Sequence, residues 1–354
     1  MAINYRRMYN ELNSKNEEFE NILVKMKAGQ DLSTKDILYI DDLKKEDIEL
    51  IFRVAYPFKQ EFIHRPQKKI PLCKGKFQVN FFFEDSTRTR TSFEIAGKHL
   101  NADTVNLSGS SISMAKKGET LMDTVRTIRS MNADIIIMRH SKAGTPGMIA
   151  KELKCPVINA GDGWHEHPTQ TLLDLYTIEE AKGRIAGLKM LLVGDVLHSR
   201  VAGSLLRGWN KMGAGEIRVC GPPTMIPKGL EEEFNCKVYY DIEEAIKDVD
   251  VVYALRIQWE RAASAFIPTV REYSKRFCIN PDRLKLAKPD AIVMHAGPIN
   301  REIDLRTEVM EGPQSKVEEM VTNGFCIRLA LLYLLLKGKP GEPSRQKRLI
   351  EVRK

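Results

Sequence analysis

Short apolar runs, rich in β-branched residues, alternate along the chain with segments whose apolar residues recur at helical spacing. The runs cover residues 77–83, 133–138, 156–158, 188–193, 217–220, 249–255 and 291–294. The helical segments cover residues 91–100, 120–131, 169–182, 202–212 and 315–336. Such alternation is typical of parallel sheets whose strands are joined by crossover helices. The sequence therefore predicts an α/β fold, with ligands bound at the carboxyl ends of the strands.

Two such series are present, one before about residue 175 and one after about residue 187. Because 354 residues exceed what one compact core usually holds, we expect two doubly wound domains, each a mainly parallel sheet flanked by helices. Residues 1–36 differ in character, since Phe19, Ile22, Leu23 and Met26 form one apolar stripe among many charges. This stripe predicts an extra N-terminal helix that packs on the body of the protein or on a partner.

The charge balance favours anionic ligands. Lys and Arg number 55 against 47 Asp and Glu, which gives a formal net charge of +8. Nucleic acid, anionic lipid and small phosphorylated or carboxylated substrates are all compatible with that charge. Aromatic residues make up 7% of the chain and lie mainly inside apolar runs, which counts against a nucleic-acid-binding surface.

The six cysteines show no Cys-x-x-Cys spacing, so we interpret them as reduced, buried thiols of a cytosolic protein. The N-terminus carries charges where a signal peptide would have its apolar core. The longest apolar stretch, residues 326–336, contains Arg328 and falls short of the roughly 20 residues needed to cross a bilayer. We therefore expect a cytoplasmic protein without a membrane-spanning segment.

The segment Ser-Thr-Arg-Thr-Arg at residues 86–90 lies between the apolar run 77–83 and a helix expected to begin near Thr91. Ser86 suits an N-cap, and the first N–H groups of the helix would point outward with the positive end of the helix dipole. With three hydroxyls and two guanidiniums added, this combination predicts a phosphate cradle. The glycine frame and lysine of a Walker A loop are missing. The alternative is a simple capped helix with surface arginines.

A second segment, residues 160–170, joins a strand to a helix whose first turn suits Pro168. His167 and Gln170 are three residues apart, so both side chains lie on one side of that turn. The His165-Glu166-His167 run does not predict a metal site, because adjacent residues of an extended chain point apart and no third ligand cluster is evident. A purely structural role for His167 is the alternative.

Further cationic groups occur in loops and at strand ends. Lys116 and Lys117 lie on a loop before the helix near Thr120, where they suit either delivery of ammonium groups to an anion or an ordinary solvated turn. Three arginines follow or end predicted strands: Arg139, Arg200 and Arg256. They indicate a ligand with several negative groups. The turn at Gly297-Pro298 can aim backbone carbonyls toward such a ligand.

Together these segments resemble the carbamoyltransferase family from about Ile40 to about Leu336. The motifs that carry the resemblance are Phe-Glu-x-Ser-Thr-Arg-Thr-Arg (83–90), Lys-Lys-Gly-Glu (116–119), Met-Arg-His (138–140), His-Pro-Thr-Gln (167–170), Gly-Asp-x-x-x-Ser-Arg (194–200) and Arg-x-Gln (256–258). Ornithine-type members carry His-Cys-Leu-Pro and Ser-Met-Gly motifs, where this chain has His-Ala-Gly-Pro (295–298) and Arg-Ile-Gln. The aspartate-type members carry the lysine loop. A second substrate with two carboxylates also calls for cationic partners.

The resemblance implies a role for each motif residue, with Thr89, Arg139, His167 and Gln170 as the catalytic set. The phosphate of carbamoyl phosphate would be held by Ser86, Thr87, Arg88 and Thr89. The carbonyl oxygen would meet Thr89, Arg139 and His167. The carbamoyl amino group would be held by Gln170 and the backbone at Gly297 and Pro298. The carboxylates of aspartate would meet Arg200, Arg256 and Gln258. Ser113 and Lys117 would reach into the site of a neighbouring subunit.

The activity implied by the resemblance is transfer of the carbamoyl group of carbamoyl phosphate to the α-amine of L-aspartate, a step of pyrimidine biosynthesis, with no metal or cofactor. The implied assembly is a homotrimer with shared active sites, and a regulatory chain is possible. The expected domains are a helical extension at 1–36, a carbamoyl phosphate-binding domain at 37–168 plus 322–354, and an aspartate-binding domain at 169–321. Alternatives are an ornithine, acylated ornithine or polyamine acceptor, a basic nucleic-acid-binding protein, and an inactive paralogue.

Overall fold

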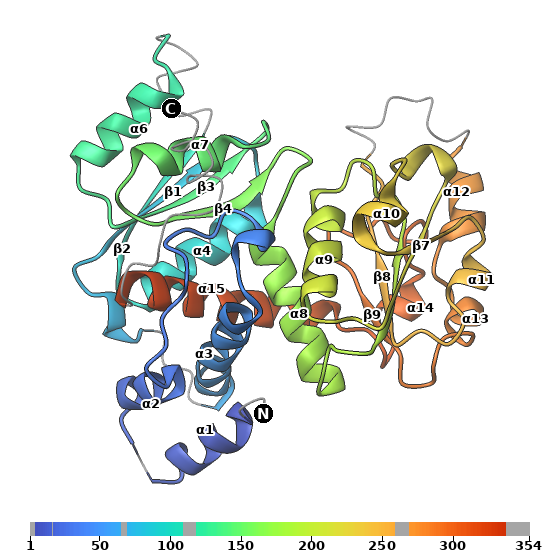
Figure 1. Cartoon of the computed structure of the whole chain (residues 1–354), viewed down its shortest axis with the longest axis horizontal. Helices are drawn as coiled ribbons and strands as arrows, with labels where there is room; N and C mark the ends of the chain where they lie inside the picture. The colour runs from blue at the N-terminus through green and yellow to red at the C-terminus, as the bar shows by residue number, and fades with distance from the viewer. Residues whose placement is uncertain (1–3, 16, 65–68, 109–117, 259–268, 338–354) are drawn as a thin grey trace. The chain divides into compact units, whose positions relative to one another are not determined.

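The structure is a computed structural model that describes residues 4–15, 17–64, 69–108, 118–258 and 269–337 (Figure 1). Contacts divide the chain into two compact units. The first unit comprises residues 1–163, 167–169 and 322–354, and the second comprises residues 164–166 and 170–321. Each unit contains one sheet with parallel strand pairs, so the predicted α/β fold with two doubly wound sheets is confirmed.

The sheet of the first unit has four strands in the order β2-β1-β3-β4. Their bounds are β1 Phe77–Phe82, β2 Asp103–Ser108, β3 Ile135–His140 and β4 Val157–Asp162. One face packs its apolar side chains, Phe81 and Met138 among them, against helices α6 (Leu121–Ser130) and α7 (Thr145–Glu152). On the opposite face Gln78 Nε2 donates to the carbonyl of Phe93 in helix α4 (Thr87–His99) at 2.9 Å. Helices therefore cover both faces, as a parallel sheet requires.

The N-terminal extension belongs to the first unit and forms two helices, α1 (Tyr5–Asn13) and α2 (Phe19–Lys27), rather than the single helix expected. The predicted stripe is largely correct, since Ile22, Leu23 and Met26 are buried. Tyr5 and Tyr9 pack edge-on against Tyr56 of helix α3 (Lys45–His64), with ring centroids 5.4 and 5.5 Å apart. The expectation missed α1 because its polar residues mask the few apolar ones.

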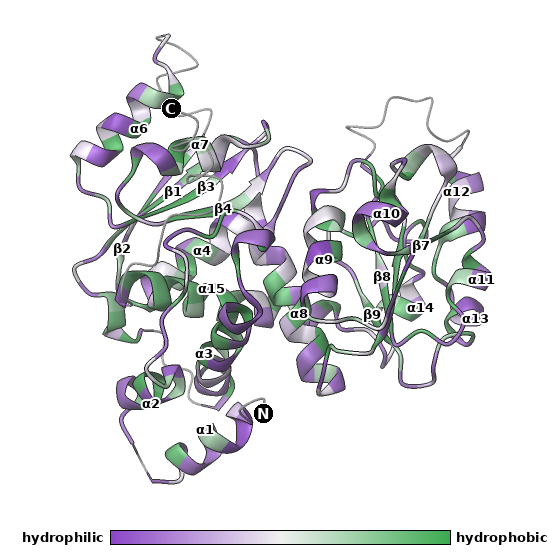
Figure 2. Cartoon of the chain, viewed as in Figure 1, coloured by the Kyte–Doolittle hydropathy of each residue, from purple (hydrophilic) through white to green (hydrophobic). Residues whose placement is uncertain are grey.

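The sheet of the second unit has five strands in the order β7-β6-β5-β8-β9. Their bounds are β5 Lys189–Val193, β6 Glu216–Cys220, β7 Lys237–Tyr239, β8 Val251–Ala254 and β9 Ile292–Met294. The main core of this unit joins one face of the sheet to helices α11 (Ile242–Ala245), α12 (Val270–Phe277), α13 (Pro281–Leu284) and α14 (Thr307–Met310). On the other face Trp209 of helix α9 (Arg200–Lys211) packs edge-on against Tyr253, with ring centroids 6.5 Å apart. In Figure 2 the central strands of both sheets, such as β3 and β8, are mainly hydrophobic.

The remaining helices are α8 (Pro168–Lys182), the short α10 (Leu230–Phe234), the 3₁₀ turns η1 (Ile40–Asp42), η2 (Pro71–Cys73) and η3 (Pro223–Met225), and α15 (Val317–Lys337). Among the described residues α15 is the one helix long and apolar enough to cross a membrane. Of its most apolar stretch of 18 residues, 67% is buried in the fold. The apolar stretch 326–336 forms the second half of this helix, which runs for 21 residues. Its burial is that of a core helix, and Arg328 on it donates to Ser92 Oγ at 2.8 Å.

The local predictions differ from the structure at one helix start and at two strands. Helix α4 (Thr87–His99) begins four residues before the expected Thr91, although its N-cap is Ser86 as predicted. The edge strands β2 and β7 were not predicted, because β2 is mostly exposed or half-buried and β7 has only three residues. The cysteines agree with expectation, since all six are thiols, five buried and Cys155 half-buried. Burial raises the pKa of the Cys73 thiol to about 12.

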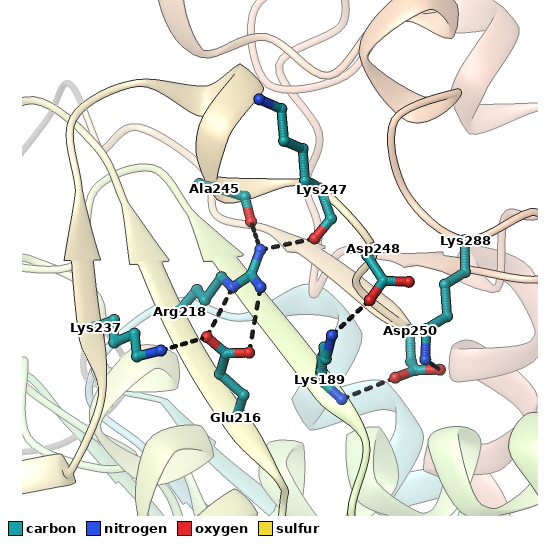
Figure 3. A network of polar contacts seen from close by, with 9 residues as sticks. All are labelled: Lys189, Glu216, Arg218, Lys237, Ala245, Lys247, Asp248, Asp250 and Lys288. Atoms are coloured by element: carbon teal, nitrogen blue, oxygen red, sulfur yellow. Dashed lines mark hydrogen bonds and ion pairs between the residues drawn. The ribbon is translucent and has the colours of Figure 1, made fainter.

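The amino-terminal edge of the second sheet carries a network of ion pairs (Figure 3). Glu216, at the start of β6, bonds both Arg218 and Lys237, at 3.2 and 2.9 Å. Arg218 also donates to the backbone carbonyls of Ala245 and Lys247, at 2.8 and 2.7 Å. Next to these, three pairs tie the strand starts together: Lys189–Asp248 at 2.5 Å, Lys288–Asp250 at 2.9 Å and the Lys189 N–H to Asp250 at 2.8 Å. Each of these charged groups therefore has a partner of opposite charge at this edge.

Candidate active site

The candidate residues of the first unit lie where its strand order reverses. The chain leaves β1 for β2 on one side and later returns as β3 on the other side of β1, so the reversal lies between β1 and β3. The segment after β1 carries residues 84–90, and β3 carries Arg139, which is paired in register with Phe82. The crevice at such a reversal is the usual ligand position in open α/β sheets. The structure thus brings the Ser-Thr-Arg-Thr segment and Arg139 to one sheet edge.

The Ser-Thr-Arg-Thr segment forms the N-terminus of helix α4. Ser86 is extended, with φ −159° and ψ 95°, and its side chain makes no capping hydrogen bond to the helix. Thr87 and Arg88 are exposed, whereas Thr89 is buried. Because the helix begins at Thr87, the motif hydroxyls and the outward-facing N–H groups of the first turn lie at the same place, as an anion site requires.

Arg139 is only 8% exposed, and two hydrogen bonds hold its guanidinium in a defined position. Its Nη2 bonds Glu84 Oε1 at 2.7 Å, and its Nη1 donates to the carbonyl of Ala160 at 3.3 Å. A buried guanidinium needs such partners because an unpaired buried charge is costly. The neighbouring His140 packs on Phe83 at 5.1 Å between ring centroids. Burial and then the charge of Lys142 lower the pKa of His140, which favours its uncharged form.

His167 precedes helix α8, which begins at Pro168 as the sequence predicts. The imidazole is buried, and its Nδ1 lies 3.5 Å from Thr169 Oγ1. Gln170 follows in the first turn of the helix and bonds Asp174. Within the described residues there is no group of three or more His, Cys, Asp or Glu side chains placed to hold a metal ion.

In the second unit the strand order reverses between β5 and β8, and the candidate arginines follow these two strands. Arg200 begins helix α9 and is 8% exposed; the N-cap Ser199 accepts from the Ala202 N–H at 3.3 Å. Arg256 and Gln258, both half-buried, follow β8. Gln258 Nε2 donates to the carbonyl of His198 at 3.0 Å, so the loop after β8 is tied to the loop after β5.

A buried histidine–carboxylate pair supports each of two loops at this edge. His198 Nδ1 lies 2.9 Å from Asp195 Oδ1, in the loop that leads to Arg200. His295 Nδ1 accepts from the Gly297 N–H at 2.7 Å, so its hydrogen lies on Nε2, 3.3 Å from Asp304 Oδ2. Gly297 has a positive φ of 63°, and the Gly297–Pro298 peptide is cis. The turn predicted at these residues is therefore present, and the hydrogen bond to His295 stabilises it.

Several supporting residues were not predicted as part of the site: Glu84, Asp174, Asp195, His198, Tyr253, His295 and Asp304. Glu84 and Asp195 stand inside the motifs quoted above, so their position beside the cationic residues was a usable signal. Tyr253 gave no signal, because its partner Asp174 is 79 residues away in the sequence. Asp304 is only nine residues from His295 but stands outside the quoted motifs. Ser113 and Lys117 lie outside the described residues.

Two family models match most of the chain. One, the carbamoyl-P binding domain of aspartate/ornithine carbamoyltransferase, matches residues 35–180, and the other, the Asp/Orn binding domain, matches residues 186–335. The aspartate carbamoyltransferase catalytic subunit of Syntrophotalea carbinolica is 51% identical over 312 residues, which cover 88% of this chain and 98% of the relative. The chain belongs to the aspartate/ornithine carbamoyltransferase family. The family predicted from the motifs is thus confirmed, and the chain is a carbamoyltransferase.

Solved carbamoyltransferase structures share the fold across both acceptor types. The aspartate transcarbamoylase of Trypanosoma cruzi, in complex with carbamoyl phosphate and aspartate, has a TM-score of 0.75 at 29% identity, covering 85% of this chain and 95% of that one. The ornithine carbamoyltransferase of Pyrococcus furiosus has a TM-score of 0.76 at 32% identity, covering 88% and 99%. The fold of the carbamoyltransferases therefore does not by itself identify the acceptor.

Proposed function

We propose that this carbamoyltransferase transfers the carbamoyl group of carbamoyl phosphate to the α-amine of L-aspartate, giving N-carbamoyl-L-aspartate and phosphate. The observation that carries the choice of acceptor is the set of side chains at the carboxyl edge of the second sheet. Arg200 and Arg256 suit an acceptor with two carboxylates. The acids at this edge, Asp195 and Asp304, are buried and bonded to His198 and His295, so they are poorly placed to meet the second ammonium group of ornithine.

Carbamoyl phosphate is bound by the first unit in this proposal. Ser86, Thr87, Arg88 and Thr89 hold the phosphate at the start of α4, where hydroxyls, a guanidinium and helix N–H groups converge. The exposure of Arg88 leaves its side chain accessible to a ligand. The expected domain from 37–168 plus 322–354 remains the proposed carbamoyl phosphate-binding domain, and 169–321 the proposed aspartate-binding domain.

The chemical step forms one C–N bond and breaks one C–O bond. The uncharged α-amine attacks the carbonyl carbon, negative charge moves onto the carbonyl oxygen, and phosphate leaves with the electron pair of the broken bond. Thr89, Arg139 and His167 donate to that oxygen and so favour the transition state over the ground state. The hydrogen bond that Arg139 donates to Glu84 fixes the guanidinium before substrate binds, which limits reorganisation during the reaction. The amine proton can leave on a phosphate oxygen.

The other substrate groups have partners in the second unit. The carbamoyl amino group is held by Gln170 and by the backbone at Gly297 and Pro298, in the turn whose Gly297 N–H donates to His295. The two carboxylates of aspartate are bound by Arg200, Arg256 and Gln258. The link from Gln258 to the backbone of His198 orients the amide between the two arginine-bearing loops.

The proposed setting is cytoplasmic pyrimidine biosynthesis by a homotrimer, with Ser113 and Lys117 completing a neighbouring subunit's site. The curated relatives are named catalytic subunits, which supports assembly and leaves room for a regulatory chain. The mass of the purified protein in solution tests the trimer directly, and a monomeric mass at assay concentrations would contradict shared sites.

Phosphate release tests the acceptor. The purified chain is assayed with carbamoyl phosphate and, separately, L-aspartate, L-ornithine, an acylated ornithine and a polyamine. We expect turnover with aspartate and background rates with the other amines. Turnover with ornithine and none with aspartate would show that the second candidate, favoured by the likeness to the Pyrococcus furiosus enzyme, is correct.

A further inference from the structure

A fully buried carboxylate lies directly behind Gln170. Asp174 is one helical turn further along α8, and its Oδ1 accepts from Gln170 Nε2 at 2.9 Å. Its other oxygen, Oδ2, accepts from the Tyr253 hydroxyl at 2.9 Å. Asp174 and Tyr253 each have 0% exposure, whereas Gln170 is half-buried. A charged residue at this depth is costly unless its hydrogen bonds are made, so the arrangement needs an explanation beyond packing.

The carboxylate determines which way round the Gln170 amide lies. An ionised carboxylate only accepts hydrogen bonds, so the NH₂ group of Gln170 must face it and the carbonyl oxygen Oε1 must face away. Within the described residues of the second unit, Oε1 accepts no hydrogen bond. The oxygen of the amide, which faces away from Asp174, is therefore the acceptor that a ligand would meet.

Tyr253 in turn holds Asp174. Burial and then the charge of Asp174 raise the pKa of Tyr253 well above its ordinary value of 10.0, while a hydrogen bond from Gln170 lowers it, so the hydroxyl remains a donor. The edge contact with Trp209 fixes the ring of Tyr253 on β8. Helix α8 and strand β8 are thus joined by a chain of hydrogen bonds that ends at Gln170.

We infer that Asp174 and Tyr253 are positioning residues that lock the Gln170 amide with its oxygen outward, so that the site selects a substrate bearing N–H donors at this point. The inference rests on the proposed contact between Gln170 and the carbamoyl amino group. Under it, the enzyme distinguishes the amino group of carbamoyl phosphate from the methyl group of acetyl phosphate, which has nearly the same size but cannot donate.

The test compares the KM of carbamoyl phosphate with the inhibition constant of acetyl phosphate, both measured with L-aspartate as acceptor. Asp174→Asn keeps the volume but can donate as well as accept, so Gln170 is no longer held one way round. We expect the preference for carbamoyl phosphate over acetyl phosphate to fall about tenfold, with the acetyl phosphate constant nearly unchanged. Tyr253→Phe should reduce the preference less, about threefold, because Asp174 still accepts from Gln170.

Two matched controls separate positioning from stability. Asp250→Asn alters another buried carboxylate of the second unit, and Tyr176→Phe removes another buried phenol from α8. Both should leave the preference unchanged even if they lower the melting temperature. A folded Asp174→Asn variant with the wild-type preference would overturn the inference, and if that variant does not fold, an unchanged preference in Tyr253→Phe would do so. A wild-type protein without turnover on carbamoyl phosphate and aspartate would instead overturn the proposed function.

Discussion

The two edges of the five-stranded sheet use charge in different ways. At the amino-terminal edge, acids and bases pair with one another, as in the group around Glu216 and Arg218 (Figure 3). At the carboxyl edge the acids Asp195 and Asp304 bond histidines instead, and the arginines Arg200 and Arg256 stand at the start of a helix and the end of a strand. Charges that pair with each other contribute to stability, whereas in the proposed function the two arginines at the carboxyl edge bind the carboxylates of aspartate.

Replacing one arginine at each edge by alanine, Arg256 at the carboxyl edge and Arg218 at the amino-terminal edge, gives the sharpest test of this comparison. Arg256→Ala should lower kcat/KM for aspartate by about 100-fold, because a charge-assisted contact to a carboxylate is lost, and should change KM for carbamoyl phosphate little. Steady-state kinetics with each substrate varied would measure both effects. Equal losses for the two substrates would contradict the assignment of Arg256 to aspartate.

Arg88→Ala extends the comparison to the first unit. The exposed guanidinium at the start of α4 should bind the phosphate, so its removal should raise KM for carbamoyl phosphate by about 30-fold and leave KM for aspartate nearly unchanged. Arg90→Ala, two residues further into the same helix, is the matched control and should have a smaller effect. A larger rise in KM for carbamoyl phosphate from Arg90→Ala than from Arg88→Ala would indicate that the phosphate binds nearer to Arg90.

Arg218→Ala is the counterpart of Arg256→Ala at the amino-terminal edge. Its loss leaves two backbone carbonyls and Glu216 without their donor, so the free energy of unfolding should fall by about 2 kcal/mol. Urea denaturation measures that change. At 25 °C the kinetic constants for both substrates should stay within twofold of the wild type, and a larger loss of activity would mean that the two edges are coupled.

Glu216→Gln should give the smallest change in stability of these variants, and that change should depend on pH. The hydrogen bonds from Arg218 and then Lys237 lower the pKa of Glu216 from 4.5 to about 2. A depressed carboxyl pKa stabilises the fold above the unfolded value and loses that contribution as pH falls from about 4.5 toward 2. The variant should therefore be less stable than the wild type at pH 7 by a small amount, because the pair is partly exposed, and the difference should vanish near pH 2. A difference that persists at low pH would exclude the ion pair as its cause.

The sequence predicted the central strands well and the edges poorly. Strand β3 is a run of four buried apolar residues, 135–138, which is unmistakable. Strand β2 lies at the edge of its sheet and has no buried residue, so its sequence lacks the apolar pattern from which a strand is predicted. Helix α4 was expected to begin late because Thr87–Arg90 contains no apolar residue, and helical periodicity is read from apolar positions.

The candidate site was predictable only as far as its motifs reach. Ser86, Arg139 and Arg256 could be predicted as candidate residues because hydroxyls and guanidiniums at strand ends have few structural uses. Their supports were not, since Arg139 and Glu84 are 55 residues apart and Asp174 and Tyr253 are 79 apart. Pairing over such distances depends on the register of strands and helices, which only the folded chain supplies.

The division of the chain has a consequence for synthesis on the ribosome. The first unit includes residues from both ends of the sequence, with most of α15 packed in it and the whole second unit inserted between. Its hydrophobic interior lacks α15 until that helix has emerged from the exit tunnel, whereas the strands of the inserted unit emerge earlier. During synthesis the proposed aspartate-binding unit can therefore fold before the proposed carbamoyl phosphate-binding unit, which still lacks α15.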